Sequence, residues 1–251
     1  MTPPGDSVIR LRKVTLHYGG DEVVREVDLD IRRGETKVIL GPSGVGKTTI
    51  LKAILGLLRP ASGEIEVDGE EISRLPEREL VKTRLKMAIV FQGGALFDSM
   101  TVGENVSFRL REHGLAPPGE IEERVQSALQ FVGLSGARKL KPAQLSGGMK
   151  KRVAIARALA AKPEVILFDE PTTGLDPINA FNMELLILKL KESHQVTIVI
   201  VTHDVGSALR LADSVAMLHE GKFIFEGSPG ELQQSSEPVV RAFREPGSIV
   251  L

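Results

Sequence analysis

The chain has 251 residues, 42% of them hydrophobic, which suits one large α/β domain or a domain with an inserted lobe. Its formal net charge of −1 gives no electrostatic footprint for nucleic acid, so no nucleic-acid partner is expected. Because the chain has no cysteine, disulfides and thiolate metal sites are excluded, as in a cytosolic protein.

Neither the first residues of the chain nor its longest apolar run predicts insertion into a membrane. Met1–Asp6 lacks the basic and apolar regions of a signal peptide. The longest strongly apolar run, Val196–Thr202, is far shorter than the ~20 residues that span a bilayer. We therefore expect the chain not to cross a membrane, and any transport pathway to be formed by another subunit.

The first two predicted elements are strands. Val8–Tyr18 and Val23–Ile31 alternate apolar and polar residues, and Gly19–Asp21 supplies a turn between them. This pattern predicts an antiparallel β-layer that precedes the next, more apolar strand.

A glycine-rich turn follows the apolar strand Lys37–Leu40. Gly41–Thr48 fits the phosphate-binding pattern G-x-x-x-x-G-K-[ST], and Thr49–Leu58 after it has helical spacing. Turn N–H groups and the helix N-terminus then face one anion, Lys47 reaches the β- and γ-phosphates, and the Thr48 hydroxyl holds Mg²⁺. The predicted nucleoside triphosphate site is Gly41, Pro42, Ser43, Gly44, Val45, Gly46, Lys47, Thr48 and Thr49.

Further along, a short strand is predicted at Gly63–Gly69, a charged helix at Pro76–Leu85 and a buried strand at Met87–Phe91. From about Gly94 to Ala161 the pattern favours helices only, near residues 102–113, 120–132 and 149–160, which indicates an inserted helical lobe. The basic cluster Lys150–Arg152 is interpreted as one solvated helix face rather than a patch for phosphate backbones.

The chain then returns to a buried strand, Val165–Asp169, which ends in two carboxylates. Asp169 can hold Mg²⁺ and Glu170 can polarise an attacking water. The elements predicted after it are a helix at 177–193, a strand at 196–202, a helix at 205–212 and a hairpin of 214–219 with 222–226.

A second feature suited to anions precedes the helix at 149–160. In Leu145–Met149, Ser146 can cap that helix, and two glycines let the backbone approach a ligand closely. Alone, this stretch is better interpreted as an ordinary capped helix start.

Together these motifs resemble an ATP-binding cassette (ABC) ATPase over about Val8–Leu232. The residues in family order and spacing are Tyr18, Gly41–Thr49, Gln92, Ser146–Met149, Asp169, Glu170, Asp176 and His203. The resemblance implies an α/β fold with a RecA-like P-loop NTPase core, an antiparallel β-layer and an inserted α-helical lobe. The whole chain would be one cassette. Its core and β-layer are expected in residues 1–92 and 163–237, its helical lobe in residues 93–162, and a C-terminal tail in residues 238–251.

The resemblance also implies a role for each matching residue in an ATPase with ATP and Mg²⁺. Tyr18 would stack on adenine, Glu170 would be the general base, and His203 would contact the γ-phosphate. Gln92 would contact Mg²⁺ and the attacking water and couple to a membrane subunit. Two copies would sandwich two ATP molecules, with Ser146, Gly147, Gly148 and Met149 facing the partner's γ-phosphate and Asp176 at the interface. Met149 departs from the glutamine common there, which removes one polar side chain.

The stretch Phe91–Val106 followed by Leu110–His113 is similar to ATPases of Mla/Mce-type phospholipid transport, or organic-solvent-resistance, systems. That similarity implies a homodimer on the cytoplasmic face of the inner membrane, bound to an integral-membrane permease. An Mce-type substrate-binding protein and a small accessory subunit are further partners it suggests.

Three other functions stay open at this point. The main alternative is the ATPase of an importer for amino acids or another small solute. An ABC ATPase of DNA repair or translation is disfavoured because the chain has neither a long coiled-coil insertion nor a second cassette. A subunit that binds ATP without turnover is disfavoured by Glu170 and His203. In the tail, Pro238–Arg244 and Ile249–Leu251 either clasp the neighbouring protomer or fray.

Overall fold

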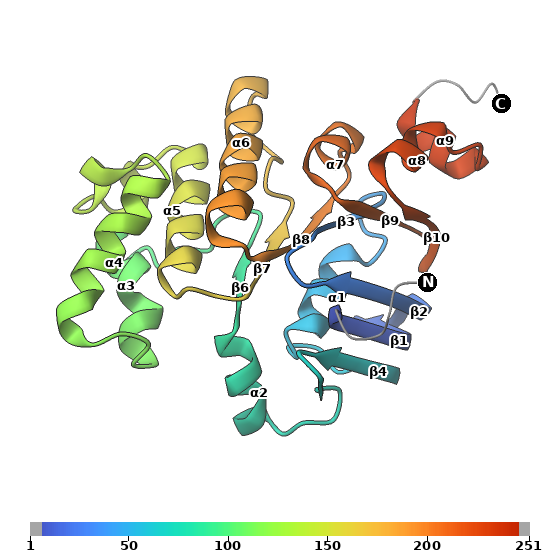
Figure 1. Cartoon of the computed structure of the whole chain (residues 1–251), viewed down its shortest axis with the longest axis horizontal. Coiled ribbons are helices and arrows are strands. Elements are labelled where there is room, and N and C mark those ends of the chain that lie inside the picture. The colour runs from blue at the N-terminus through green and yellow to red at the C-terminus, as the bar shows by residue number, and fades with distance from the viewer. Residues whose placement is uncertain (1–6, 246–251) are drawn as a thin grey trace. The chain divides into compact units, whose positions relative to one another are not determined.

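The computed structural model describes residues 7–245, and these form two compact units (Figure 1). The first unit takes the described residues up to Leu85 and from His194 onward, and the second is Lys86–Ser193. The lobe predicted for residues 93–162 lies inside the second unit. The division of the cassette at residues 92 and 163 stays a prediction.

The predicted β-layer is confirmed in the first unit. It is an antiparallel sheet in the order β2-β1-β4-β5, made of β1 (Ser7–Tyr18), β2 (Asp21–Arg32), β4 (Ser62–Val67) and β5 (Glu70–Glu71). Figure 1 shows β1, β2 and β4 side by side. Buried and exposed residues alternate along the second half of β2, as the sequence pattern predicts for a half-buried strand.

Three parallel strands carry the predicted anion-binding turn in the same unit. They are β3 (Thr36–Leu40), β8 (Thr197–Thr202) and β9 (Ser214–His219), and β10 (Lys222–Gly227) pairs antiparallel to β9. β3 and β8 are buried along their whole length, as apolar parallel strands usually are. Because Leu40 pairs with both Thr202 and Met217, the carboxyl ends of the three strands meet at one edge.

Helix α1 (Lys47–Ile54) follows the turn and packs against β1 and β8. The prediction that this helix reaches Leu58 is wrong, because Gly56 takes a φ of 65 and turns the chain after α1. Leu57 beyond the turn is 55% exposed and does not continue the buried face. The other helices of this unit are α2 (Glu77–Leu85), α7 (Val205–Leu211), α8 (Pro229–Gln234) and α9 (Pro238–Arg244).

The last two helices were not predicted. α8 begins with a capping box in which Ser228 and Glu231 satisfy each other's backbone N–H groups. α9 starts at the predicted tail and buries Val240 to 1% exposure, so this one residue belongs to the core. Ile249–Leu251 lie outside the described residues.

The second unit contains a parallel pair, β6 (Met87–Val90) and β7 (Val165–Asp169), and four longer helices. These are α3 (Val102–Glu112), α4 (Pro118–Phe131), α5 (Gly147–Ala160) and α6 (Pro177–His194), with 3-10 turns at Ser135–Ala137 and Pro142–Gln144. Helices α3, α4 and α5 pack on one another, and α5 also packs on β6. The absence of a strand from Gly94 to Ala161 is confirmed.

Candidate functional site

The turn between β3 and α1 presents backbone donors to one point. Gly46 stands at the N-cap of α1 with φ 110, and no side chain caps the helix. The first N–H groups of an α-helix have no partner within the helix, and here they are left for an external acceptor. This arrangement is the one that binds phosphate groups at helix N-termini.

Gly41 begins this turn where the backbone passes very close to β9. Its N–H donates to the Thr202 carbonyl over 3.3 Å. A Cβ built on Gly41 would lie 2.3 Å from the Leu218 carbonyl oxygen, closer than two such atoms can approach. The motif therefore needs glycine at this position for space.

Lys47 connects both ends of the turn. It is 5% exposed, and its ammonium donates to the carbonyls of Gly41 over 2.8 Å and Pro42 over 2.9 Å. The side chain thus folds over the loop that precedes it. A phosphate group in the loop would meet a positive charge already held in place.

Two other predicted residues lie near this turn in the same unit. Tyr18 ends β1 with 57% of its surface exposed, and the Lys52 ammonium of α1 lies 4.9 Å from its ring centroid. His203 is exposed and follows Thr202, which pairs with Leu40 immediately before the turn. The first unit thus brings Tyr18 beside α1, and His203 to the strand edge from which the turn starts.

In the second unit, three predicted residues lie at or just beyond the carboxyl ends of β6 and β7. Val90 pairs with Phe168, so Gln92 and Asp169 leave the pair at one edge. Asp169 is 7% exposed and Glu170 is 9% exposed, whereas Gln92 is exposed in a turn. The carboxylates are therefore held in the protein, and the amide faces outward.

Glu170 sits in a tight turn with an unusual backbone. Its φ of 50 lies in the left-handed region, which costs a residue other than glycine about 1 kcal/mol or more. The Thr173 hydroxyl donates to Glu170 Oε2 over 2.9 Å. Thr173, which sequence reasoning did not select, thus restricts the carboxylate that it did select.

The prediction that Lys150–Arg152 forms a solvated face is wrong for its middle residue. Lys151 is 6% exposed, and its ammonium donates to backbone carbonyls of the turn after β7. The sequence did contain a signal for this burial. Lys151 shares the helical spacing i, i+3, i+4 with Ala154 and Ile155, which are both fully buried.

The start of α5 agrees with the predicted cap. Ser146 Oγ accepts the Met149 N–H over 3.3 Å, and a Cβ on Gly147 would meet no atom within 4 Å. Gly148 faces the start of α6, with its Cβ position 3.7 Å from the Leu175 side chain. Ser146 and Gly147 are exposed, so this helix N-terminus is open to a ligand.

Asp176 caps α6 within the same unit. Its carboxylate accepts the Asn179 side chain over 2.6 Å and the N–H groups of Ile178 and Asn179 over 3.1 and 3.0 Å. These hydrogen bonds, that of the Asn179 side chain first, lower the pKa of Asp176. Asp176 is exposed, and it stays ionised at neutral pH.

The loop after Gln92 is tied to α5 by an arginine that sequence reasoning missed. The Arg157 guanidinium donates to the carbonyls of Ala95 over 2.8 Å and Gly94 over 2.9 Å. Burial lowers the pKa of Arg157. Helix α5 therefore holds both loops, the one after β6 through Arg157 and the one after β7 through Lys151.

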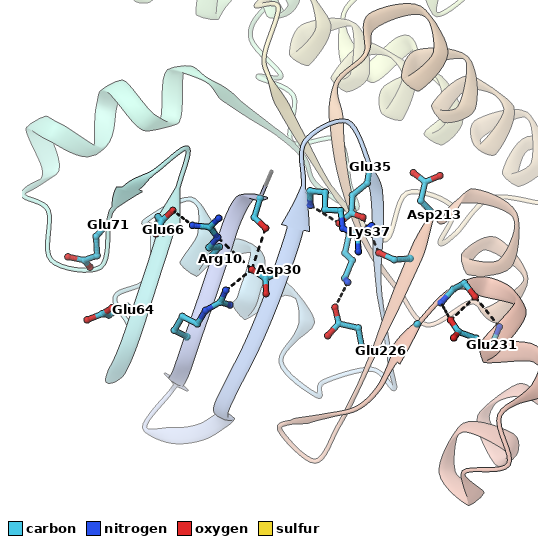
Figure 2. A pocket seen from close by; sticks show the side chains of 16 residues that line it. Arg10, Asp30, Glu35, Lys37, Glu64, Glu66, Glu71, Asp213, Glu226 and Glu231 are labelled. Carbon is cyan, nitrogen blue, oxygen red and sulfur yellow. Dashed lines mark hydrogen bonds and ion pairs between the residues drawn. The ribbon is translucent and has the colours of Figure 1, made fainter. Parts of the chain in front are cut away.

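A large pocket lies elsewhere in the first unit, near the amino end of β3 and away from Gly41. It has a volume of about 840 Å³ (Figure 2). Carboxylates outnumber cations on its wall, but several are already bonded: Glu66 to Arg10 over 3.0 Å, and Glu226 to Lys37 over 2.5 Å. Figure 2 marks both pairs with dashed lines. We do not assign the nucleotide to it.

The ion pair of Lys37 and Glu226 in this pocket predicts that removing one partner costs more stability than removing the other. The Lys37 side chain is 3% exposed and Glu226 is 48% exposed. Glu226→Ala leaves a buried ammonium without its carboxylate, so we expect the free energy of unfolding to fall by about 3 kcal/mol. Lys37→Met removes the buried charge and leaves Glu226 to water, and should cost about 1 kcal/mol or less. Urea unfolding measures both, and equal losses would contradict the assignment.

Comparison with protein families matches residues 24–173 to the ABC transporter family. This match covers more than half of the chain. The chain belongs to the ABC transporter family. The resemblance predicted from its motifs is thus confirmed, and the protein is an ABC ATPase.

Relatives of this ABC ATPase include transport proteins of known name. The ATP-binding protein MlaF of the intermembrane phospholipid transport system of Haemophilus influenzae is 42% identical over 92% of this chain and 88% of the relative. MlaF of Escherichia coli K12 is 41% identical over 94% and 88%. The probable ribonucleotide transport ATP-binding protein mkl of Mycobacterium leprae is 42% identical over 96% of this chain but 69% of its own length.

Solved structures confirm the predicted ABC ATPase fold. The protein cbiO1 of Clostridium perfringens, described as part of the ABC transporter complex cbiONQ, superposes with a TM-score of 0.84 at 33% identity and 96% coverage of both chains. The cassette MJ0796, as a dimer bound to ADP and Pi, gives 0.80 at 36% identity, over 88% of this chain and 98% of that one. Among residues 7–245 of this ABC ATPase, no helix is both long and apolar enough to span a bilayer.

Proposed function

We propose that this ABC ATPase is the ATP-hydrolysing subunit of a transporter that moves phospholipid between membranes. The observation that carries the proposal is its identity of 41–42% with two MlaF proteins along nearly their whole length. Mla-type similarity in the stretch around Gln92 supports the same cargo. Closure of two copies around ATP would drive a partner permease.

In the first unit, the turn Gly41–Thr48 would bind the phosphates of ATP. The open N-terminus of α1 and the pre-positioned Lys47 ammonium support this role. Tyr18, exposed beside Lys52, would stack on adenine, and His203 would contact the γ-phosphate. Thr49 is buried in the first turn of α1 and would fix the helix start.

Mg²⁺ would be held by Thr48, Asp169 and Gln92, together with phosphate oxygens. The donor set fits the ion, because hydroxyl, carboxylate and amide oxygens are its usual protein ligands. The residues 7–245 contain no cluster of three or more His, Asp or Glu that could hold a metal by itself, so the phosphates would supply the remaining ligands. When bound, Mg²⁺ would neutralise charge on the β- and γ-phosphates.

Glu170 would be the general base that takes a proton from the attacking water. Glu170 is 9% exposed and its carboxylate accepts the Thr173 hydroxyl, which restricts its orientation. Gln92 would orient the same water and pass dimer closure to the permease. Its exposed position in a turn supports contact with another protein.

A second copy of the chain would complete the site. Ser146, Gly147, Gly148 and Met149 would contact the γ-phosphate of the partner's ATP, which the open N-terminus of α5 supports. Asp176, ionised and exposed, would lie at the dimer interface. The dimer of MJ0796 with ADP and Pi supports this arrangement by its similarity.

The complex would lie on the cytoplasmic face of the inner membrane. An integral-membrane permease would form the pathway, and an Mce-type substrate-binding protein and a small accessory subunit would complete the system. The second candidate cargo is a small solute, in particular a ribonucleotide, because mkl carries that name at 42% identity.

Purification of the chain with its membrane partner from native membranes tests the cargo. We expect phospholipid to co-purify above the level in a matched detergent extract, and ATP hydrolysis to rise when the complex is placed in phospholipid vesicles. The complex carrying Glu170→Gln is the control that cannot turn over. Stimulation by ribonucleotides, with no retained phospholipid, would support the second candidate instead.

A further inference from the structure

Helix α5 carries a lysine on its buried face that the roles above do not use. Lys151 is 6% exposed and shares that face with Ala154, Ile155 and Ala158. Lysine is rarely buried this deeply unless its charge has partners. Burial lowers the pKa of Lys151, and the Glu170 carboxylate acts on it in the opposite direction.

The partners of Lys151 are three carbonyls of a single turn. Its ammonium donates to Thr173 over 2.6 Å, to Pro171 over 2.8 Å and to Glu170 over 3.3 Å. An ammonium has three N–H donors, so the turn uses all of them. The carbonyls converge on one atom, and a planar guanidinium could not match that geometry.

The turn that Lys151 holds is the one that aims Glu170. Glu170 has φ 50, a conformation that persists only where surrounding contacts enforce it. Thr173 Oγ1 donates to the carboxylate of Glu170, and the Thr173 carbonyl accepts from Lys151. The backbone and the side chain of the turn are therefore fixed from two sides.

We propose that Lys151 is a positioning residue for ATP hydrolysis, which holds the turn 170–173 in the conformation that directs the Glu170 carboxylate. The inference rests on the proposed role of Glu170 as general base. Lys151 lies one helical turn after Gly147, so it joins the ligand-facing start of α5 to the turn that carries the base.

The test compares substitutions of Lys151 by steady-state kinetics. Lys151→Met keeps the apolar stem and removes all three hydrogen bonds. We expect kcat to fall at least tenfold while KM for ATP changes less than twofold, because the nucleotide contacts are elsewhere. Lys151→Gln retains two N–H donors and should fall between Lys151→Met and the wild type. Assays run well below the unfolding midpoint of each variant.

Lys150→Met is the matched control. Lys150 is the preceding residue of the same helix, is partly exposed, and the structure gives its ammonium no hydrogen bond or ion pair among residues 7–245. We expect wild-type kcat from this variant. A fall equal to that of Lys151→Met would overturn the proposal, because loss of any lysine in this helix would then suffice.

The Glu170→Gln background separates positioning from a purely structural role. If Lys151 acts through Glu170, Lys151→Met should leave the residual turnover of Glu170→Gln unchanged, since the base is already lost. The same fold-loss in both backgrounds would overturn the proposal. Wild-type kcat in Lys151→Met and Lys151→Gln, with Glu170→Gln inactive, would also overturn it. Wild-type kcat in Glu170→Gln would instead refute the proposed role of Glu170.

Discussion

Replacing Glu170 with glutamine is expected to lower kcat for ATP hydrolysis by about 10²–10⁴-fold, the usual effect of losing a general base. Glutamine has nearly the same shape and can still accept the Thr173 hydroxyl, which lies 2.9 Å from the carboxylate. ATP binding should therefore persist, and ATP should hold a stable dimer. Phosphate release measures the first effect, and size-exclusion chromatography with ATP measures the second.

The control for this prediction is Glu192→Gln, which removes an exposed carboxylate from α6 in the same unit. It should retain wild-type turnover. If Glu170→Gln hydrolyses ATP at the wild-type rate, Glu170 is not the base. If it loses both turnover and ATP binding, the turn serves the fold rather than the chemistry.

Replacing Gly41 with alanine should abolish ATP binding and lower the midpoint of thermal unfolding. The new Cβ would lie 2.3 Å from the Leu218 carbonyl oxygen, and both positions belong to backbone that neighbouring strands fix. Relief requires β9 or the start of the turn to move, at a cost of about 3 kcal/mol or more. Calorimetry and binding of a fluorescent ATP analogue measure the two effects.

Gly44→Ala supplies the comparison for that prediction. A Cβ on Gly44 meets no atom within 4 Å, although its φ of 82 makes alanine strained. We expect a smaller loss of stability, about 1 kcal/mol. Equal losses from Gly41→Ala and Gly44→Ala would show that backbone conformation, and not the close approach to β9, decides the requirement for glycine.

Much of the fold could be predicted because local patterns and long-range packing agree. Strand β3 ends in three consecutive apolar residues and is buried along its length, and the glycine turn after it admits few other conformations. The register of β3 against β8, which brings His203 to the turn, could not be predicted from the spacing of motifs. Strand pairing depends on contacts between residues far apart in the chain, and no local signal determines it.

The errors share a physical cause, which is that charge and apolarity were taken as guides to burial. Lys151 was placed on a solvated face, yet three backbone carbonyls compensate its charge inside the protein. Leu58 was placed on the apolar face of a helix, yet Gly56 ends α1 before it. In both cases a specific backbone conformation, invisible in composition, outweighed the residue type.

The tail shows the opposite error, in which a weak pattern concealed a packed element. Val240 is a single apolar anchor on the short helix α9, and one residue does not make a periodic signal. The start of α8 was easier to predict from the sequence, because Ser228 followed three residues later by Glu231 is the pattern of a capping box.

The ion pair of Lys37 and Glu226 has a consequence for the register of strand β10. β10 lies at the edge of its sheet and pairs with β9 through the tight turn Glu220–Gly221, in which both residues have positive φ. That turn opposes a slip of β10 by one residue. Such a slip would turn Glu226 to the opposite face of the sheet and leave the buried Lys37 ammonium without its carboxylate. The ion pair thereby adds to the turn in specifying the alignment of this edge hairpin, and with it the point from which α8 and α9 begin.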